Sequence, residues 1–362
     1  MPHLTQDDVA DRVVVTALCD PVTARMQAAA ERFGVRATFS DLGELLAADV
    51  VDAVTIVSPI GLHYDHCRLA LEAGKHVHVN KTMTTTVAEA DALIALARER
   101  DRRLVASPGE ILRPQVTRTR ELIKDGAIGR LSWAICGTPF ERYHEADEPE
   151  RGGEVGGTPI DPAWYFRKPG GGPLYDMTVY ALHQLTGVLG PARRVTALSG
   201  VLIPERSFLG RSIRTEADDN TIMLLDFGES VFAIAFGTVA GALTDQFGAA
   251  LYLGTAGTIE GVLLNGEPFD FRGRELTTDA PPSDWDAQMR VLPHVTGVHR
   301  ELPEAHVFED VMQLVRWARD GVPSPVTAEH ARHVIDIIES AYCAADSGAT
   351  QELTTTFELP VR

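Results

Sequence analysis

Residues 57–81 read VSPIGLHYDHCRLALEAGKHVHVNK. A helical pattern that ends at Gly74 joins two apolar runs, one ending at Val57 and the other covering Lys75–Val79. Parallel strands need a crossover helix of this kind, and open α/β sheets bind ligands at the carboxyl ends of their strands. Lys81 follows the second strand, where it can be partly desolvated and point into the crevice. Taken alone, this lysine could equally be a surface charge at a helix entrance.

The alternation of strands and helices extends to both sides of this segment. Strands are predicted at Val13–Cys19, Val50–Val57, Lys75–Val79 and Arg103–Ser107, with helices between them. Val13–Cys19 is a continuous apolar run, which is typical of a parallel strand buried on both faces. Asp20 and Pro21 then suit a helix N-cap and first turn, and Thr86 with Glu89 forms a capping box. These patterns predict a doubly wound, Rossmann-like parallel sheet over residues 1–113.

The pattern changes after Pro114. An irregular segment over residues 138–172 precedes a helix at Pro173–Leu189, and alternating strands dominate from Val195 to Gly266. Two further helices are predicted at Val307–Asp320 and Ala328–Asp346. Residues 114–362 are therefore expected to form an α+β domain with a large antiparallel sheet, and the last helix can pack back on the first domain.

Composition narrows the functional classes. The chain has 33 Lys and Arg against 51 Asp and Glu, a net charge of −18, which disfavours binding to polyanionic nucleic acid. No apolar run reaches the roughly 20 residues of a membrane helix, so no membrane partner is expected. The first residues do not resemble a signal peptide, and the four cysteines lie in apolar stretches, as buried thiols of a reducing compartment do. We therefore predict a cytoplasmic protein.

Several segments, in matching order, resemble the Gfo/Idh/MocA family of nicotinamide-dependent sugar and cyclitol oxidoreductases. They are Ser58–His63, Ala70–Lys81, Gly126–Gly129, Gly170–His183 and Leu253–Ile259. The resemblance runs over nearly the whole chain. It implies a dinucleotide-binding first domain, a second domain that binds a sugar or polyol, and a homodimer or homotetramer formed through the antiparallel sheet.

The resemblance also implies the catalytic residues. Lys81 corresponds to the family's active-site lysine, and Tyr180 stands where many members have a catalytic histidine. A subgroup similar to glucose–fructose oxidoreductase and dimeric dihydrodiol dehydrogenase has tyrosine there. Asp176 lies four residues earlier, on the same face of the predicted helix. A phenol, with an ordinary pKa of about 10, can accept a hydroxyl proton if the Lys81 ammonium lowers that pKa.

Cofactor contacts follow from the same resemblance. Asp20, at the end of a strand, suits the adenosine ribose hydroxyls, and with no arginine recognised beside it NAD is expected rather than NADP. The other expected cofactor-binding residues are Ser58, Pro59, His63, Asn80 and Lys81. No metal is expected, because the histidines at positions 63, 66, 76 and 78 lack matching cysteine or carboxylate spacing.

Three residues are candidates for the substrate pocket. Trp164 and Arg167 lie just before the glycine triplet and can form its walls. His183 occupies the family position that contacts a substrate hydroxyl, so it either binds substrate or is a core histidine with satisfied hydrogen bonds.

The chain departs from the family pattern in two further ways. A Gly-x-Gly-x-x-Gly turn occurs nowhere, and Val13–Cys19 already resembles the family's second strand, so the first strand–helix unit and its pyrophosphate cradle are absent. Either the start codon is assigned too late, which we favour, or the unit is genuinely lost. The family's Glu-Lys-Pro is here Asn80-Lys81-Thr82, which keeps the lysine but removes a neighbouring carboxylate.

These observations predict an NAD(P)-dependent oxidoreductase that transfers hydride to or from a secondary hydroxyl of a sugar, glycoside or cyclitol. Two alternatives remain open at this point. One is redox-neutral cleavage of a glycoside by transient oxidation with bound NAD. The other is a non-catalytic sugar-binding homologue that has lost its dinucleotide site. The sequence does not name the substrate or the direction of the reaction.

Overall fold

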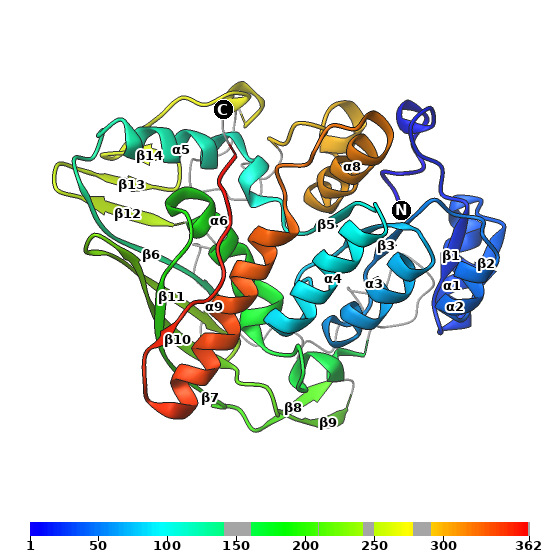
Figure 1. Cartoon of the computed structure of the whole chain (residues 1–362), viewed down its shortest axis with the longest axis horizontal. Helices are drawn as coiled ribbons and strands as arrows, with labels where there is room; N and C mark the ends of the chain where they lie inside the picture. Colours follow the sequence, from blue (N-terminus) through cyan, green and yellow to red (C-terminus); the bar gives the residue numbers. More distant parts are fainter. Residues whose placement is uncertain (141–160, 209, 242–249, 278–290, 361–362) are drawn as a thin grey trace.

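The computed structural model describes residues 1–140, 161–208, 210–241, 250–277 and 291–360. A parallel α/β region formed by the first part of the chain lies beside a large sheet formed by the rest (Figure 1). The predicted fold class, a Rossmann-like sheet followed by an α+β domain with a large and mostly antiparallel sheet, is confirmed. Among the described helices, none is long and apolar enough to cross a membrane.

Three parallel strands in the order β3-β4-β5 form the centre of the first region. They are β3 (Ala53–Ile56), β4 (His76–Val79) and β5 (Leu104–Ala106), connected by α3 (His63–Glu72) and α4 (Val87–Glu99). Leu71 of α3 and Leu93 of α4 are fully buried in the core of this region. The capping box predicted at Thr86 and Glu89 is present and begins α4. This part of the chain therefore folds as its pattern predicts.

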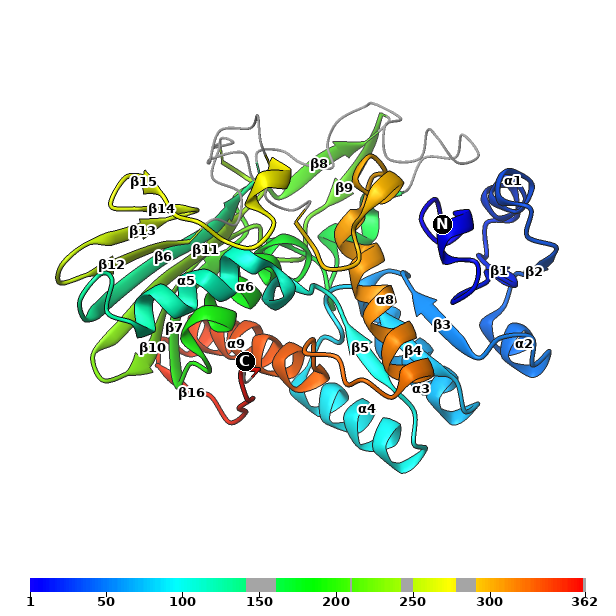
Figure 2. The same ribbon diagram turned by 90° about the horizontal axis from the view of Figure 1, so that it is seen from above.

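The first two strands form a separate pair. β1 (Ala17–Cys19) and β2 (Ala37–Phe39) are parallel to each other but are not hydrogen-bonded to β3, and Figure 2 shows them set apart from it with α1 (Thr23–Phe33) and α2 (Leu42–Ala47). The prediction of a strand at Val13–Cys19 buried on both faces is wrong: β1 has three residues, and Val14 is 67% exposed. Within the described residues, no strand covers the other edge of β1, which explains the exposure.

Two smaller expectations also differ from the structure. Cys19 in β1 is exposed, as is Cys343, so burial of the thiol holds only for Cys67 and Cys136. The helix expected to begin at Asp20 begins later, with Val22 as its N-cap residue, although the Asp20 carboxylate accepts a hydrogen bond from the Val22 amide at 2.7 Å.

The second region is built on a nine-stranded sheet in the order β15-β14-β13-β12-β6-β11-β10-β7-β16. Its strands are β6 (Leu131–Pro139), β7 (Arg194–Gly200), β10 (Asn220–Gly228), β11 (Val231–Thr238), β12 (Leu251–Gly254), β13 (Thr258–Glu260), β14 (Leu263–Leu264), β15 (Glu267–Pro268) and β16 (Gln351–Glu352). All neighbours are antiparallel except β6 and β11, which run parallel. A separate hairpin, β8 (Glu205–Phe208) and β9 (Arg211–Arg214), lies beside it.

Among the described residues, helices cover one face of this sheet and leave the other uncovered. α6 (Val179–Leu189) and α9 (Ala328–Ser347) pack on it, and α5 (Pro114–Lys124) packs on α6. Along β10, Met223 and Leu225 are buried beneath the helices, whereas Ile222 and Leu224 point the other way and are exposed. This period of two is the signature of a strand with one covered face. The uncovered face is nevertheless apolar, and its exposed side chains include Trp133, Leu198, Ile222, Leu224 and Phe232.

The last two long helices join the regions. α8 (Ala305–Asp320) packs against β4 and β5, and α9 packs against α4 while also covering β7. Ala328, Ala331 and Ile335 of α9 belong to the core of the parallel region. The C-terminal helices therefore fix the carboxyl ends of β4 and β5 relative to the large sheet.

Candidate active site

Lys81 and Asp176 form a buried ion pair between the two regions. Lys81 follows β4, and Asp176 lies in the turn η6 (Leu174–Thr178) that leads into α6. The Lys81 Nζ contacts the Asp176 carboxylate and also donates to the Asp176 carbonyl oxygen at 2.6 Å. Their side chains are 14% and 8% exposed. A buried charge needs a partner of this kind, so the pair holds the ammonium in a defined place.

Further hydrogen bonds tie the loop after β4 to the same turn. The Thr82 hydroxyl donates to the Tyr175 carbonyl oxygen at 2.6 Å, and the Tyr175 hydroxyl donates to the Thr85 carbonyl oxygen at 2.7 Å. Burial raises the pKa of Tyr175, which keeps this phenol protonated and able to donate. The loop that carries Lys81 is therefore held rigidly against the turn that carries Asp176.

The glycine triplet lets the backbone of the second region approach the loop after β3. Gly170 has a φ of +85°, and a Cβ built there would lie 2.9 Å from the Gly61 amide nitrogen. A Cβ at Gly61 would in turn lie 2.9 Å from the Pro169 carbonyl oxygen. Only glycine tolerates both the backbone conformation and the contact. The backbones of Pro169–Gly170 and Gly61 are therefore in direct contact at the carboxyl end of β3.

Tyr180 lies beside the ion pair, in the first turn of α6. The Lys81 Nζ is 5.4 Å from the centre of the Tyr180 ring, and the Tyr180 hydroxyl lies 3.2 Å from His306 Nε2. Residues 173–189 were expected to form one α-helix, but residues 174–178 form a π-turn, which occurs frequently at functional sites. Asp176 and Tyr180 nevertheless both face Lys81, one as its ion-pair partner and the other as a ring beneath its ammonium.

The expected effect of Lys81 on Tyr180 is not found. Burial, followed by the negative charge of Asp176, raises the pKa of Tyr180 well above its usual value. The Lys81 ammonium is paired with Asp176 and lies over the ring, and it is not among the groups that shift that pKa. Tyr180 is therefore a protonated phenol at neutral pH, suited to donating a proton to a carbonyl oxygen. Loss of its own proton requires an acceptor.

His306 was missed by the sequence reasoning. It stands 126 residues after Tyr180, in the first turn of α8, where no motif marks it. Its contact with Tyr180 arises because α8 packs across the ends of β4 and β5. The only available signal was a histidine near the start of a predicted helix, which is uninformative without the fold.

The predicted cofactor residues of the β3 and β4 loops lie together, and His63 and Asn80 among them contact neighbouring protein groups. His63 is buried, and its ring nitrogens lie 2.7 Å from the carbonyl oxygens of Ser58 and Thr82. Burial lowers the pKa of His63 to about 4, so its neutral ring carries one N–H and donates to one of these two oxygens. We therefore reassign His63 from cofactor contact to positioning. The Asn80 side chain accepts a hydrogen bond from the Lys81 amide at 2.8 Å.

Ser58 and Pro59 remain at the crevice. Ser58 is half-buried, with its hydroxyl 2.9 Å from His66 Nδ1, and Pro59 is exposed at the start of the turn η2 (Ile60–Leu62). Of the predicted cofactor-binding residues of this loop, Ser58 and Pro59 are thus the two that remain accessible.

Asp20 lies at the end of β1, as predicted, and its carboxylate has two hydrogen-bond partners within the protein. Its carboxylate accepts from Arg25 Nη1 at 3.1 Å as well as from the Val22 amide. The expectation that no arginine lies near Asp20 is therefore corrected, since Arg25 is one helical turn away. In this structure the arginine is paired with the carboxylate, which leaves Asp20 as the group available to ribose hydroxyls.

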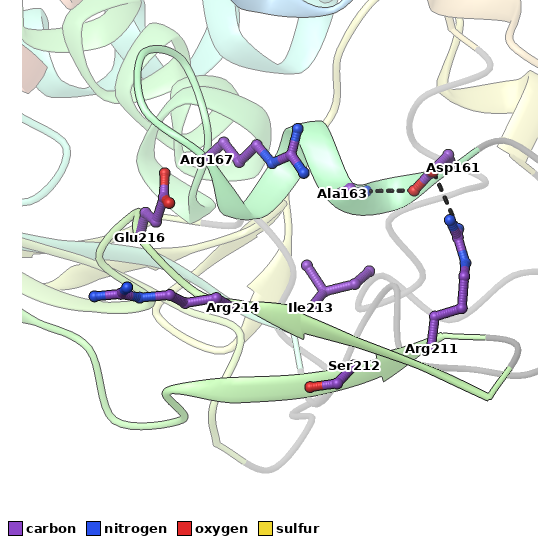
Figure 3. Close-up of a pocket in the computed structure, with 8 residues that line it drawn as sticks. All are labelled: Asp161, Ala163, Arg167, Arg211, Ser212, Ile213, Arg214 and Glu216. Carbon is purple, nitrogen blue, oxygen red and sulfur yellow. Dashed lines mark hydrogen bonds and ion pairs between the residues drawn. The ribbon is translucent and has the colours of Figure 1, made fainter.

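The three predicted substrate residues lie in different surroundings. Trp164 is half-buried in the turn η5 (Pro162–Phe166), with its ring 5.8 Å from that of Tyr165. Arg167 is exposed and lines a shallow hollow between η5 and β9, where Asp161 and Arg211 form an ion pair at 3.0 Å (Figure 3).

His183 lies in the core of the second region. Its ring is 4.6 Å from that of His330 in α9, and burial lowers its pKa to about 3. The structure thus favours the core alternative over a substrate contact for this residue. Elsewhere in the described part of the chain, no group of three or more histidine, cysteine or carboxylate side chains is arranged to hold a metal ion.

Comparison with known proteins identifies the family of both regions. A family model described as "Oxidoreductase family, NAD-binding Rossmann fold" matches residues 3–107, and one described as "GFO/IDH/MocA C-terminal domain" matches residues 116–260. The scyllo-inositol 2-dehydrogenase (NADP(+)) IolW of Bacillus subtilis is 23% identical over 92% of this chain and 87% of that protein. A dTDP-3,4-didehydro-2,6-dideoxy-alpha-D-glucose 3-reductase of Saccharopolyspora spinosa is 31% identical over 60% of this chain and 64% of that protein.

Other similarities are shorter or concern the fold alone. The chain spans about half the length of several curated relatives, such as the D-glucoside 3-dehydrogenase of Escherichia coli, which is 27% identical over 49% of this chain and 46% of that protein. The WlbA dehydrogenase of Bordetella pertussis, solved with NADH and UDP-GlcNAcA, has a TM-score of 0.74 at 19% identity and covers 98% of this chain and 95% of that one.

Proposed function

The chain belongs to the Gfo/Idh/MocA family of oxidoreductases, and on this premise we propose that it transfers hydride between NAD and a secondary hydroxyl of a sugar, glycoside or cyclitol. The observation that carries the proposal is the buried Lys81–Asp176 pair with the Tyr180 ring beneath its ammonium. Curated relatives named for inositol, glucoside and nucleotide-sugar substrates support the same class of substrate.

The chain's own residues supply the proton chemistry and the orientation. In reduction of a carbonyl, the Tyr180 phenol donates the proton while the Lys81 ammonium stabilises the negative charge that develops on the oxygen. Asp176 holds Lys81 in place by ion pairing. In oxidation the same proton moves in the reverse direction, from the substrate hydroxyl to Tyr180. The packed loops around the ion pair exclude water, which strengthens each of these interactions.

The residues present fit both ends of a dinucleotide. Asp20 at the end of β1 suits the adenosine ribose, and the Ser58–Pro59 loop with Lys81 suits the nicotinamide end. When bound, NAD supplies the hydride acceptor or donor, and the matching family model is described as NAD-binding.

Turnover and binding assays test this function. The full chain is mixed with NAD⁺ and, separately, with scyllo-inositol, a methyl glucoside and a nucleotide sugar, and the absorbance of reduced nicotinamide is followed. We expect saturable NADH binding by fluorescence and net reduction of NAD⁺ with at least one alcohol. Release of the aglycone from a glucoside without net NADH formation would instead support redox-neutral glycoside cleavage. Sugar binding without any NADH binding in calorimetry would support a non-catalytic homologue.

We also propose that the uncovered face of the nine-stranded sheet forms a homodimer interface. Five large apolar side chains are exposed there, including Leu198 at 74% and Leu224 at 54%. An apolar face of this kind typically marks a protein–protein interface. Light scattering should report a dimer or larger assembly, and Leu224→Lys should shift it toward monomer without unfolding. A monomeric wild-type chain would contradict this proposal.

A further inference from the structure

His306 connects the Tyr180 hydroxyl to the surface of the molecule. Its Nε2 lies 3.2 Å from the Tyr180 hydroxyl and 3.6 Å from Glu304 Oε2. The His306 side chain is 15% exposed and that of Glu304 is 71% exposed. The three groups therefore form a short path from a half-buried phenol to a carboxylate in water.

The chemistry of the site requires such a path in one direction of the reaction. Tyr180 is a protonated phenol, so it can accept the proton of a substrate hydroxyl only if its own proton leaves at the same time. Lys81 does not take that proton, because it is a paired ammonium that contacts both the Asp176 carboxylate and carbonyl oxygen. The nitrogen lone pair of a neutral imidazole at hydrogen-bond distance is the available acceptor.

We propose that His306 is a further catalytic residue, a proton relay that carries the Tyr180 proton to Glu304 and solvent. The inference rests on the proposed function. As the substrate O–H bond breaks, its proton bonds to the Tyr180 oxygen, and the Tyr180 proton moves to His306 Nε2. The hydride from the same substrate carbon reduces NAD⁺, leaving a carbonyl product, NADH and an imidazolium. The imidazolium then returns its proton through Glu304 to water, and reduction runs through the same steps in reverse.

The surrounding charges make His306 a transient carrier. Burial is the main cause that lowers the pKa of His306 to about 3, and the positive charges of Arg113 and Lys81 lower it further. The imidazolium is therefore short-lived and readily gives up its proton, and Glu304 is the nearby carboxylate that can receive it.

Negative charges near Tyr180 affect its pKa at the other end of the relay. Besides burial and Asp176, the carboxyl groups of Glu304, Glu110 and Asp310 raise its pKa, so a tyrosinate without the relay is unfavourable. Oxidation should therefore depend on the coupled transfer of two protons.

Replacement of His306 by glutamine tests the relay. His306→Gln retains a hydrogen-bonding group near Tyr180 but cannot carry a proton at neutral pH. We expect kcat for oxidation to fall about 100-fold, at the lower end of general acid–base effects, with unchanged NADH affinity and circular dichroism. Imidazole added to His306→Ala should restore part of kcat. Glu304→Gln should lower kcat only a few-fold because water can replace the exposed carboxylate. His294→Gln, in the segment before α8, is the matched control and should leave kcat unchanged.

A second measurement is independent of turnover. In the cofactor-free protein, NMR of isotope-labelled histidine should show His306 as a neutral ring whose Nε2 accepts a hydrogen bond, and Tyr180→Phe should shift that signal. Full kcat in His306→Gln, or an Nε2 that carries the hydrogen, would overturn the relay alone. Wild-type protein that binds NADH yet turns over none of the alcohols would overturn the proposed function, and with it the relay.

Discussion

The two ends of the cofactor crevice are built differently. At the nicotinamide end, the loop after β4 is tied to the turn before α6 by the Lys81–Asp176 pair and by hydrogen bonds of Thr82 and Tyr175. At the adenosine end, Asp20 follows a three-residue strand that pairs, in the part of the chain that the structure describes, with β2 alone. Placement of a reacting group depends on packing around it, so the first end is organised for chemistry, whereas the second contributes mainly binding.

The largest expected effect lies at the nicotinamide end. Lys81→Ala removes the ammonium that stabilises developing charge and leaves Asp176 buried without its partner. We expect kcat to fall by about 10²–10⁴ with little change in NADH affinity. Steady-state kinetics and NADH fluorescence measure the two effects separately. Equal losses of kcat and NADH affinity would assign Lys81 to cofactor binding and remove the contrast between the ends.

The difference in packing between α4 and β1 should also appear in the free energy of unfolding of variants in each element. Leu93→Ala in α4, whose side chain is fully buried, should lower the free energy of unfolding by about 2–5 kcal/mol. Leu18→Ala in β1 is the matched control, since this leucine is only half-buried, and it should cost less than about 1 kcal/mol. Denaturant unfolding of both variants gives these values. A cost for Leu18→Ala as large as that for Leu93→Ala would mean that β1 is as tightly packed as the rest of the region.

Asp20 should control which dinucleotide is preferred. Asp20→Ser removes the carboxylate that binds Arg25 and would repel a 2′-phosphate, so the freed Arg25 can pair with that phosphate. We expect the preference for NADH over NADPH to fall about tenfold, equivalent to about 1.4 kcal/mol, with kcat nearly unchanged. Competition between the two cofactors in a fluorescence titration measures it. An unaltered preference would show that Asp20 does not face the adenosine ribose.

The smallest expected effect concerns pH. Burial raises the pKa of Asp310 to about 8, and its carboxyl accepts hydrogen bonds from the Ser107 hydroxyl and the Gly109 amide beside β5. Because unfolding restores a carboxyl pKa of about 4, the neutral form stabilises the fold fully below that pH, and this contribution is lost as pH rises to about 8.

The free energy of unfolding should therefore fall between pH 7 and pH 8, above the range in which the buried histidines titrate. Asp310→Asn should make that slope shallower, as measured by denaturant unfolding at several pH values. An identical slope in the variant would mean that Asp310 is already ionised at neutral pH.

Sequence patterns predicted the elements whose stability is local. β3, α3 and β4 appear where the apolar runs of residues 50–79 place them, and the Thr86 capping box begins α4 as expected. The length of β1 was overestimated because strand burial depends on a neighbouring strand rather than on the run of valines itself. The parallel pairing of β6 with β11 depends on contacts between distant segments, so no local pattern indicates it.

In the candidate site, too, the sequence did not predict properties that depend on contacts between distant segments. Lys81, Asp176 and Tyr180 were found because a family resemblance marks them, and the structure places them together. The pKa of Tyr180, the partner of Asp20 and the contact of His306 all depend on three-dimensional surroundings that residue spacing does not encode.

Deuterium transfer tests the central proposal most directly. The full chain is incubated with NAD⁺ and with scyllo-inositol or a methyl glucoside deuterated at its ring carbons, and the cofactor is then examined by mass spectrometry. Hydride transfer at this site predicts NADH carrying one deuterium with the wild-type protein and almost none with Lys81→Ala or Tyr180→Phe. NAD⁺ that binds but acquires no deuterium from either alcohol, or equal transfer by all three proteins, would contradict the proposed role of Lys81 and Tyr180.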